Sequence, residues 1–277
     1  MLFFRCLNKV EFKDWDIVGK VGVGGQGDIY KVRRGDVTAV LKRVKLSKKK
    51  KRKRFLREIH VLRSMDHPNI IELIDDNLDE IGEKKYGYYV MPYARFGNLA
   101  QRVGEYKNDI DKSLKCFLKI CAGVEHAHKK YPPIVHRDIV AENILFVDSV
   151  ERPVISDFGI CCYGAKSLKD AKEKNSKPED IVPAPERIKG REDDAVIQTD
   201  IYFLGKLLYR MLAGGEKLPG FSYEADKYNL AKKYTDPRYE RINEEIFAGS
   251  IVPDALQRFD SVGDMIEICA SLIEEES

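Results

Sequence analysis

The spacing of apolar residues changes period along this chain, and that change constrains the fold more than any other feature. Residues 15–46 alternate short β-branched stretches with glycines, as strands joined in hairpins do. Helical spacing follows over 55–62, and 86–91 has the composition of another strand. Beyond these, a helix with one apolar face is expected over 111–124, with Asp111 as its N-cap, and 201–211 is apolar on most faces. Two short apolar runs, 144–147 and 154–155, are suited to a small hairpin. The pattern predicts an α+β fold in which a small strand-rich part with one main helix precedes a larger helical part.

The composition argues against a fully disordered protein and against a transmembrane helix. With 43% hydrophobic and 10% aromatic residues over 277 positions, the chain can build a core and is not disordered throughout. No uncharged apolar run approaches the roughly 20 residues that a transmembrane helix requires. Six cysteines without a CxxC pair or regular spacing indicate neither a disulfide framework nor a zinc site. We therefore expect a cytoplasmic protein in a reducing compartment.

The positive charge is concentrated in one run. The net charge is +3, yet residues 42–57 carry 11 basic groups and no acid, which leaves 37 basic against 45 acidic residues elsewhere. Seven of these cations are consecutive, from Lys48 to Arg54. A solvated turn between strand and helix is the ordinary role of such a run, and docking to an acidic protein, nucleic acid or anionic lipid surface is the alternative. Nothing outside the run indicates nucleic-acid binding.

A glycine-rich loop lies between two of the expected strands and contains Gly22, Gly24, Gly25 and Gly27. Glycine lets backbone N–H groups approach a phosphate without a Cβ in the way. Because no helix starts at this loop, a dinucleotide-binding turn is excluded. Glycine-rich hairpins are common, so the loop alone does not distinguish a phosphate site from a plain turn.

Several short motifs follow in a fixed order. Lys42 ends an apolar strand, and Glu58 lies sixteen residues later in the helical segment; alone, either residue would be ordinary surface. Order and spacing together make coincidence improbable for the later motifs. These are His136-Arg137-Asp138, Asn143, Asp157-Phe158-Gly159 and Ala184-Pro185-Glu186.

Taken together, these motifs resemble the eukaryotic-type protein kinase family over nearly the whole chain, from about Trp15 to Ile273. The resemblance implies a bilobal fold in a single catalytic domain over 1–277, with nothing added on either side. Its N-lobe would end near residue 91, its hinge would span about 92–96, and its C-lobe would begin near 97. The match also includes His67-Pro68-Asn69-Ile70, Thr199 to Gly205, and Arg258.

The same resemblance implies ATP and Mg²⁺ as cofactors, with Mn²⁺ as an alternative ion. Lys42, oriented by Glu58, would hold the α- and β-phosphates, and Asp138 would accept the proton of the attacking hydroxyl. Asn143 and Asp157 would be the metal ligands. The remaining nucleotide-binding residues would be the four loop glycines together with Ile29, Val40, Met91, Tyr93 and Leu145.

The chain departs from the family at two places. Members that phosphorylate Ser and Thr carry a lysine two residues after the catalytic aspartate, where this chain has Val140, and no cation stands at Glu142 either. The loss of one phosphate-facing charge is expected to cost about 3 kcal/mol of transition-state stabilisation, and Lys177 is a candidate replacement. No threonine lies between Gly159 and Ala184.

The leading hypothesis is an ATP- and Mg²⁺-dependent kinase of protein Ser and Thr hydroxyls that also phosphorylates itself, with Ser167 and Ser176 as candidate sites. The alternative is a weak or inactive pseudokinase that acts as a binding or scaffold module, which Val140 favours. A small-molecule phosphotransferase is a third reading. It is disfavoured by Ala184-Pro185-Glu186 and Arg258, which belong to the protein-substrate segment of the family.

Overall fold

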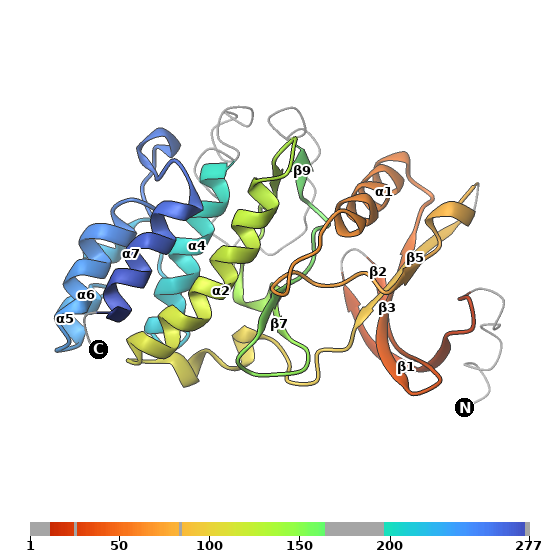
Figure 1. The fold of residues 1–277 in the computed structure, drawn as a ribbon, viewed down its shortest axis with the longest axis horizontal. Helices are drawn as coiled ribbons and strands as arrows, with labels where there is room; N and C mark the ends of the chain where they lie inside the picture. Colours follow the sequence, from red (N-terminus) through yellow and green to blue (C-terminus); the bar gives the residue numbers. More distant parts are fainter. Residues whose placement is uncertain (1–11, 25–26, 83–84, 164–196, 275–277) are drawn as a thin grey trace. The chain divides into compact units, whose positions relative to one another are not determined.

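The computed structural model describes residues 12–24, 27–82, 85–163 and 197–274. The chain forms two compact units, one made of Met1–Asp66 and Ile71–Arg95 and the other of His67–Ile70 and Phe96–Ser277. The first unit is rich in strands and the second in helices, as the change of period predicts (Figure 1). Among the described residues, no helix has both the length and the hydrophobicity needed to cross a bilayer.

The first unit is built on a five-stranded sheet in the order β1-β2-β3-β5-β4, in which every neighbouring pair is antiparallel. The strands predicted over 15–46 and 86–91 are confirmed. The elements of this unit are β1 (Asp16–Gly24), β2 (Gly27–Arg34), β3 (Val37–Lys45), α1 (Lys49–Arg63), β4 (Asp75–Asp76), a 3₁₀ turn η2 (Leu78–Glu80) and β5 (Tyr86–Pro92).

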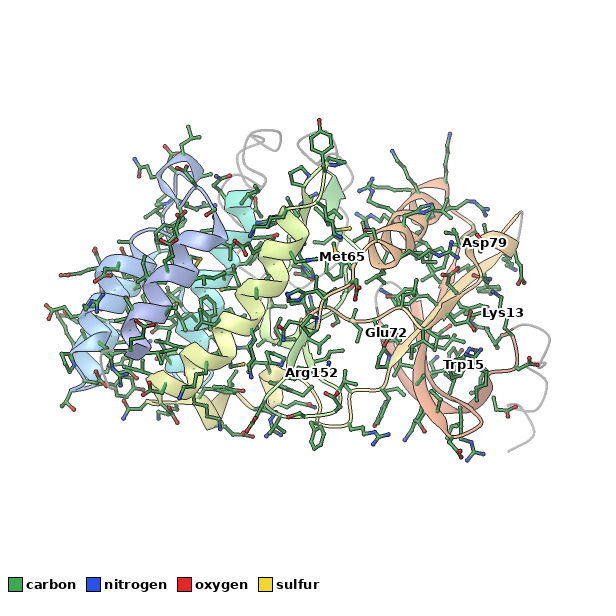
Figure 2. All side chains as sticks on the ribbon, viewed as in Figure 1. Lys13, Trp15, Met65, Glu72, Asp79 and Arg152 are labelled. Atoms are coloured by element: carbon green, nitrogen blue, oxygen red, sulfur yellow. The ribbon has the colours of Figure 1, made fainter. Side chains whose placement is uncertain are left out.

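One face of the sheet forms an apolar core. Alternate residues of the strands point to the same face, so a period of two gathers their apolar side chains there. Trp15, labelled in Figure 2, is buried in this core, and its indole N–H donates to Asp75 Oδ2 at 2.9 Å. The buried members of the core are Phe12, Trp15, Tyr30, Val32, Ala39, Leu41, Tyr88 and Val90.

Helix α1 buries Phe55, Ile59 and Leu62, the residues whose spacing predicts it. Phe55 approaches Gly87 of β5 so closely that a Cβ there would lie 2.3 Å from the phenyl ring. The placement of the basic run is corrected: residues 49–54 form the opening turns of α1 rather than a turn before it. Lysine and arginine are good helix formers, and this propensity outweighs the repulsion among the charges.

Helices dominate the second unit. Helix α2 contacts both α4 and α7, and α4 is buried along most of its length, as its all-round hydrophobicity predicts. Asp109, not Asp111, caps α2: its side chain accepts the N–H of Lys112 at 2.9 Å. The helices and helical turns are η3 (Leu99–Gln101), η4 (Val103–Tyr106), α2 (Ile110–His128), η5 (Ala141–Asn143), α4 (Ile197–Leu212), η7 (Ser222–Glu224), α5 (Leu230–Lys233), α6 (Arg238–Arg241), η8 (Ile242–Phe247), η9 (Ala255–Gln257) and α7 (Val262–Glu274).

Two small strand pairs lie in the described part of the second unit. The strands β7 (Ile144–Phe146) and β8 (Pro153–Ile155) form the short hairpin that the apolar runs predict. The strands β6 (Ile134–Val135) and β9 (Cys162–Tyr163) pair antiparallel. Asn69 ties its own loop to β8, because its carbonyl accepts the N–H of Ile155 and its amide donates to the carbonyl of Pro153, each at 2.8 Å. The segment between β6 and β8 contains the predicted residues Asp138 and Asn143.

Candidate active site

Lys42 and Glu58, predicted as partners, form an ion pair inside the first unit. Lys42 Nζ lies 2.7 Å from Glu58 Oε1, and only 7% of Lys42 and 3% of Glu58 are exposed. The sheet brings the lysine from β3, and the buried face of α1 brings the carboxylate. Such a pair repays its desolvation only when the geometry is good and the remaining lone pairs find donors.

Sequence reasoning missed one member of this group, Tyr89 of β5. Its hydroxyl donates to Glu58 Oε1 at 2.7 Å, the same oxygen that Lys42 contacts. In the strand register Tyr89 is directly opposite Lys42, so both side chains lie on the same face of the sheet. Tyr89 could have been found only from the register of β3 against β5, and the local sequence does not determine that register.

The glycine loop joins β1 to β2, and Gly22 pairs with Ile29 while Gly24 pairs with Gly27. A Cβ on Gly27 would lie 2.3 Å from the carbonyl oxygen of Arg43, so packing alone requires glycine there. A Cβ on Gly22 would meet no atom of the described chain within 4 Å, so packing does not require that glycine. The predicted Gly25 lies outside the described residues.

Charged side chains brace the strands beside this loop. Asp28 accepts from Lys20 of β1 at 2.8 Å and from Arg43 of β3 at 3.1 Å, which links three adjacent strands. The hydrogen bond from Lys20 is the largest cause that holds the pKa of the Asp28 carboxyl below its usual value. Burial opposes it, and the weaker effect of the Arg43 hydrogen bond adds to it. The strands that flank the loop are therefore fixed by ionic contacts as well as by the sheet.

The predicted apolar nucleotide residues are found in both units. In the first, Val40 pairs with Met91 across β3 and β5, Ile29 is opposite Lys42, and Lys31 Nζ lies 4.5 Å from the ring centroid of Tyr93. In the second, the half-buried Leu145 of β7 pairs with Val154. The first group lies on neighbouring strands beside the Lys42–Glu58 pair.

Asp138 and Asn143 meet in the second unit. Asn143 Nδ2 donates to Asp138 Oδ2 and to the Asp138 carbonyl, each at 2.9 Å. The 3₁₀ turn η5 brings Asn143 back toward Asp138, and the N–H and hydroxyl of Ser156 donate to the Asn143 carbonyl at 2.8 and 2.9 Å. These bonds fix the rotation of the Asp138 carboxylate, which is 4% exposed.

His136 and Asp200 hold the backbone that leads to Asp138. Asp200, fully buried on α4, accepts the N–H of His136 at 2.8 Å and that of Arg137 at 2.6 Å. The Asp138 N–H donates to His136 Nδ1 at 3.2 Å, so the proton of a neutral His136 ring is on Nε2, which donates to the Ser156 carbonyl at 3.0 Å. The backbone N–H groups of His136, Arg137 and Asp138 thus all have acceptors within the second unit.

Backbone strain marks two of the predicted motifs. Arg137 has φ +70° and Asp157 has φ +60°, a left-handed conformation that is uncommon outside glycine. Phe158 packs its ring edge-on against His136 with 4.6 Å between centroids. The Nε and Nη2 atoms of Arg137 are buried and have no hydrogen-bond partner among the described residues. Strain of this kind persists where surrounding contacts impose it, and it clusters at functional sites.

The segment around Val140 is contacted by a cation from another helix. Val140 is half-buried and extended, with φ −129°. Two residues later, Glu142 is bound by Arg210 of α4, whose Nη1 lies 2.9 Å from both carboxylate oxygens. Sequence reasoning missed Arg210, which is 68 positions away along the chain. The structure therefore brings a cation to the Asp138–Asn143 segment from α4, bound to a carboxylate. Lys177 lies outside the described residues.

The predicted metal ligands fit a hard cation in their chemistry. Both bonds of the Asn143 amide to Asp138 use its nitrogen, which leaves the carbonyl oxygen Oδ1 as an acceptor. Asp157 supplies a carboxylate, and Mg²⁺ prefers such oxygen ligands, completing its shell with water and phosphate oxygens. Within the described part of the chain, no three His, Cys, Asp or Glu side chains gather as a metal cluster. Asn143 and Asp157 would fill only part of an octahedral shell, and phosphate oxygens and water would supply the rest.

Comparison with known proteins shows which family this chain belongs to. The family model described as "Protein kinase domain" matches residues 15–261. Serine/threonine-protein kinase A of Synechocystis sp. is 32% identical over 221 residues, which cover 72% of this chain and 40% of that protein. PknD of Chlamydia muridarum, also named a serine/threonine-protein kinase, is 29% identical over 312 residues, which cover 95% of this chain and 32% of that protein. The chain thus spans less than half the length of these curated relatives.

Proposed function

Because this chain belongs to the protein kinase domain family, we propose that it is an ATP- and Mg²⁺-dependent kinase that phosphorylates Ser and Thr hydroxyls of protein substrates. The observation that carries the proposal is the contact of Asn143 with the Asp138 carboxylate, since a general base must be held in a defined orientation. The names of the relatives support Ser and Thr over Tyr as acceptors. The domain would comprise both units, with the hinge near 92–96.

Asp138 would act on the acceptor hydroxyl. Its carboxylate would orient the hydroxyl and take its proton as the oxygen attacks phosphorus. The bond from Asn143 prevents rotation of the carboxylate, and the Asp200 contacts fix the backbone beneath it. Because the transferring group is so highly charged, such positioning and electrostatic stabilisation supply most of the catalysis.

Lys42, Asn143 and Asp157 would serve the nucleotide. Lys42, held by Glu58, would neutralise charge on the α- and β-phosphates, and the loop that contains Gly22 would bring backbone N–H groups close to them. Asn143 Oδ1 and the Asp157 carboxylate would hold Mg²⁺. When bound, the ion neutralises charge on phosphate oxygens. Ile29, Val40, Met91 and Tyr93 of the first unit and Leu145 of the second are proposed as the residues that bind the base.

The test is transfer of γ-phosphate from ATP by the wild type and Asp138→Asn, with the acceptor amino acids identified. We expect phosphoserine or phosphothreonine from the wild type and a loss of about 10²-fold or more in the variant. Asp148→Asn is the matched control, because Asp148 is an exposed acid of the second unit that forms an ion pair with Arg152. A wild type that binds ATP without transferring phosphate would instead support the pseudokinase reading.

Autophosphorylation is part of the same proposal. The candidate acceptors Ser167 and Ser176 lie outside the described residues, as does Ala184-Pro185-Glu186. Arg137 supports a phosphate partner, because a buried guanidinium is stabilised by an anion that accepts its N–H bonds. Intact-mass analysis after incubation with ATP and Mg²⁺ tests the step, and an unchanged mass in an active enzyme would contradict it.

The basic run is proposed to bind an acidic protein segment. Its exposed members Lys48, Lys49, Lys51 and Lys53 lie at the start of α1, and the cluster is charge-complementary to such a partner. Changing these four to Gln should weaken binding of a polyglutamate peptide at low salt by about tenfold or more. The control is Lys115→Gln with Lys129→Gln, two exposed lysines of which the first lies in α2 and the second is its C-cap. Preference for RNA or for anionic vesicles over the peptide would reject the acidic-protein assignment.

We also propose a cytoplasmic location, which the described free cysteines support.

A further inference from the structure

We propose that Tyr89 is a positioning residue of the phosphate-transfer site, whose hydroxyl holds the Glu58 carboxylate in the orientation that binds Lys42. The role of Tyr89 toward Glu58 does not depend on the proposed function. Only the assignment of ATP as the ligand of Lys42 rests on it. The three side chains come from β5, α1 and β3, all within the first unit. Each is almost fully buried, with 1% of Tyr89, 3% of Glu58 and 7% of Lys42 exposed.

The geometry converges on a single atom. Glu58 Oε1 accepts from Tyr89 Oη and from Lys42 Nζ, each at 2.7 Å. Tyr89 and Lys42 are register partners on adjacent antiparallel strands, and Lys42 Nζ lies 5.3 Å from the Tyr89 ring centroid. The tyrosine therefore contacts both members of the ion pair: its hydroxyl reaches the anion, and its ring lies within cation–π range of the cation.

One bond from lysine does not by itself determine which way a carboxylate is turned. A Glu side chain rotates about its last bond, so a single contact is compatible with several orientations of the second oxygen. A second donor on Oε1 selects one of them. Hydrogen bonds to ionised groups are short and strong, and a buried charge depends on them because water does not reach it. The Tyr89 hydroxyl thus determines the orientation of Glu58, not merely its charge.

The ring of Tyr89 is itself held in place. Phe55 of α1 packs against it with 6.4 Å between ring centroids. Phe55 and Glu58 are three residues apart on α1 and so lie on the same side of the helix. Tyr89 consequently meets α1 at two points, one apolar and one charged, which opposes both rotation and sliding of that helix segment.

The neighbouring Tyr88 provides a matched control. It is equally buried, at 2% exposure, but points to the opposite face of β5, where it packs edge-on against Phe12. Its hydroxyl has no hydrogen-bond partner among the described residues. Tyr88→Phe therefore removes a buried hydroxyl of the same strand without removing a contact to Glu58.

The experiment compares Tyr89→Phe with Tyr88→Phe in the full chain, using ATP with Mg²⁺ for both affinity titrations and phosphate-transfer kinetics. We expect Tyr89→Phe to weaken ATP affinity and to lower kcat/KM by about tenfold, and Tyr88→Phe to change either by less than about twofold. Because Tyr89 acts through Lys42, Tyr89→Phe should add less than about twofold to the affinity loss of Lys42→Met. A structural role alone would leave the effect of Tyr89→Phe undiminished in that background.

Two results would overturn the proposal: equal effects of the two tyrosine changes, or an effect of Tyr89→Phe that persists at full size beside Lys42→Met. An inactive wild type that binds ATP would end the proposed function, and the affinity ratios alone would then decide the role of Tyr89. A wild type that binds no ATP would end both.

Discussion

Asp200 accepts the backbone N–H of Arg137 at 2.6 Å, which connects helix α4 to the residue that precedes Asp138. The other carboxylate oxygen accepts the N–H of His136 at 2.8 Å and lies 2.9 Å from His128 Nε2. One buried carboxylate therefore serves three donors, and it does so beside a backbone with φ +70° at Arg137. The backbone of His136 and Arg137 is therefore held by a side chain that lies 63 or more positions away along the chain.

Asp200→Asn should destabilise the protein although it preserves size and shape. An amide has one acceptor oxygen, so its NH₂ group must face at least one of the three donors, and a buried donor loses its partner. We expect a loss of about 2–3 kcal/mol in the free energy of unfolding, measured by denaturant titration. Asp226→Asn, at an exposed pair with Lys232, should cost less than about 0.5 kcal/mol. Equal losses would contradict the role assigned to Asp200.

Gly27→Ala and Gly22→Ala should separate packing from binding in the glycine loop. At Gly27 the new Cβ would lie 2.3 Å from the Arg43 carbonyl, so strands must shift and stability should fall by about 1–3 kcal/mol. At Gly22 the Cβ meets nothing within 4 Å in the described chain, so stability should change by less than about 0.5 kcal/mol while ATP affinity falls. Thermal unfolding with and without ATP distinguishes the two effects; a stable Gly27→Ala would be inconsistent with the close approach.

Val140→Lys should raise the rate of phosphate transfer. The site is half-buried with an extended backbone that any side chain adopts, so a lysine can be accommodated there. A cation two residues after Asp138 would stabilise developing charge on the transferring group, and we expect kcat to rise about tenfold or more. Val140→Met, which adds length without charge, is the control. Equal kcat for both variants would show that another cation already serves this purpose.

Lys206 should make stability rise with pH in the mildly alkaline range. Its Nζ donates to the carbonyls of Leu218 and Gly220, and burial lowers the pKa of its ammonium to about 8. The unfolded chain keeps this proton up to its ordinary pKa of 10.5, so between these values the unfolded state binds more protons and the free energy of unfolding increases with pH. Below about pH 8 both states are protonated, and the cost of burying the charge is fully present.

Urea titrations at pH 7.5 and 9.5 test this dependence. Relative to Lys206→Met, the wild type should gain about 1–2 kcal/mol between the two pH values. The subtraction removes titrations that both proteins share. A difference that does not depend on pH would mean that Lys206 keeps an ordinary pKa in the folded protein.

Local patterns predicted the elements well. The buried helix α4 follows from apolar residues on most of its faces, and the β7–β8 hairpin follows from two short apolar runs. The errors occurred where local signals compete. Asp109 and Asp111 are both good caps, and only the structure shows that Asp109 accepts the Lys112 N–H.

The contacts that complete the site could not be predicted from neighbouring residues in the sequence. Tyr89 and Glu58 are 31 positions apart, and Arg210 and Glu142 are 68 apart. Each contact depends on strand register or helix packing, which are settled by the fold as a whole. Sequence motifs therefore predict Lys42, Glu58, Asp138 and Asn143 as site residues, but not the side chains of Tyr89 and Arg210 that contact this part of the chain.

The positive charge at the start of α1 should make the first turns of that helix less stable than the rest. The free N–H groups at a helix N-terminus already carry partial positive charge, and here the cap is Lys48 with no side-chain bond and no acid in the first turn. The opening turns should therefore unwind more readily than the rest, and their amide hydrogens should exchange fastest. Glu58 lies nine residues beyond Lys49, about two and a half turns further on, where Phe55 and Ile59 anchor the helix. An anion bound at the start would lengthen the ordered helix toward its N-terminus while the Glu58 end, already fixed, stays where it is.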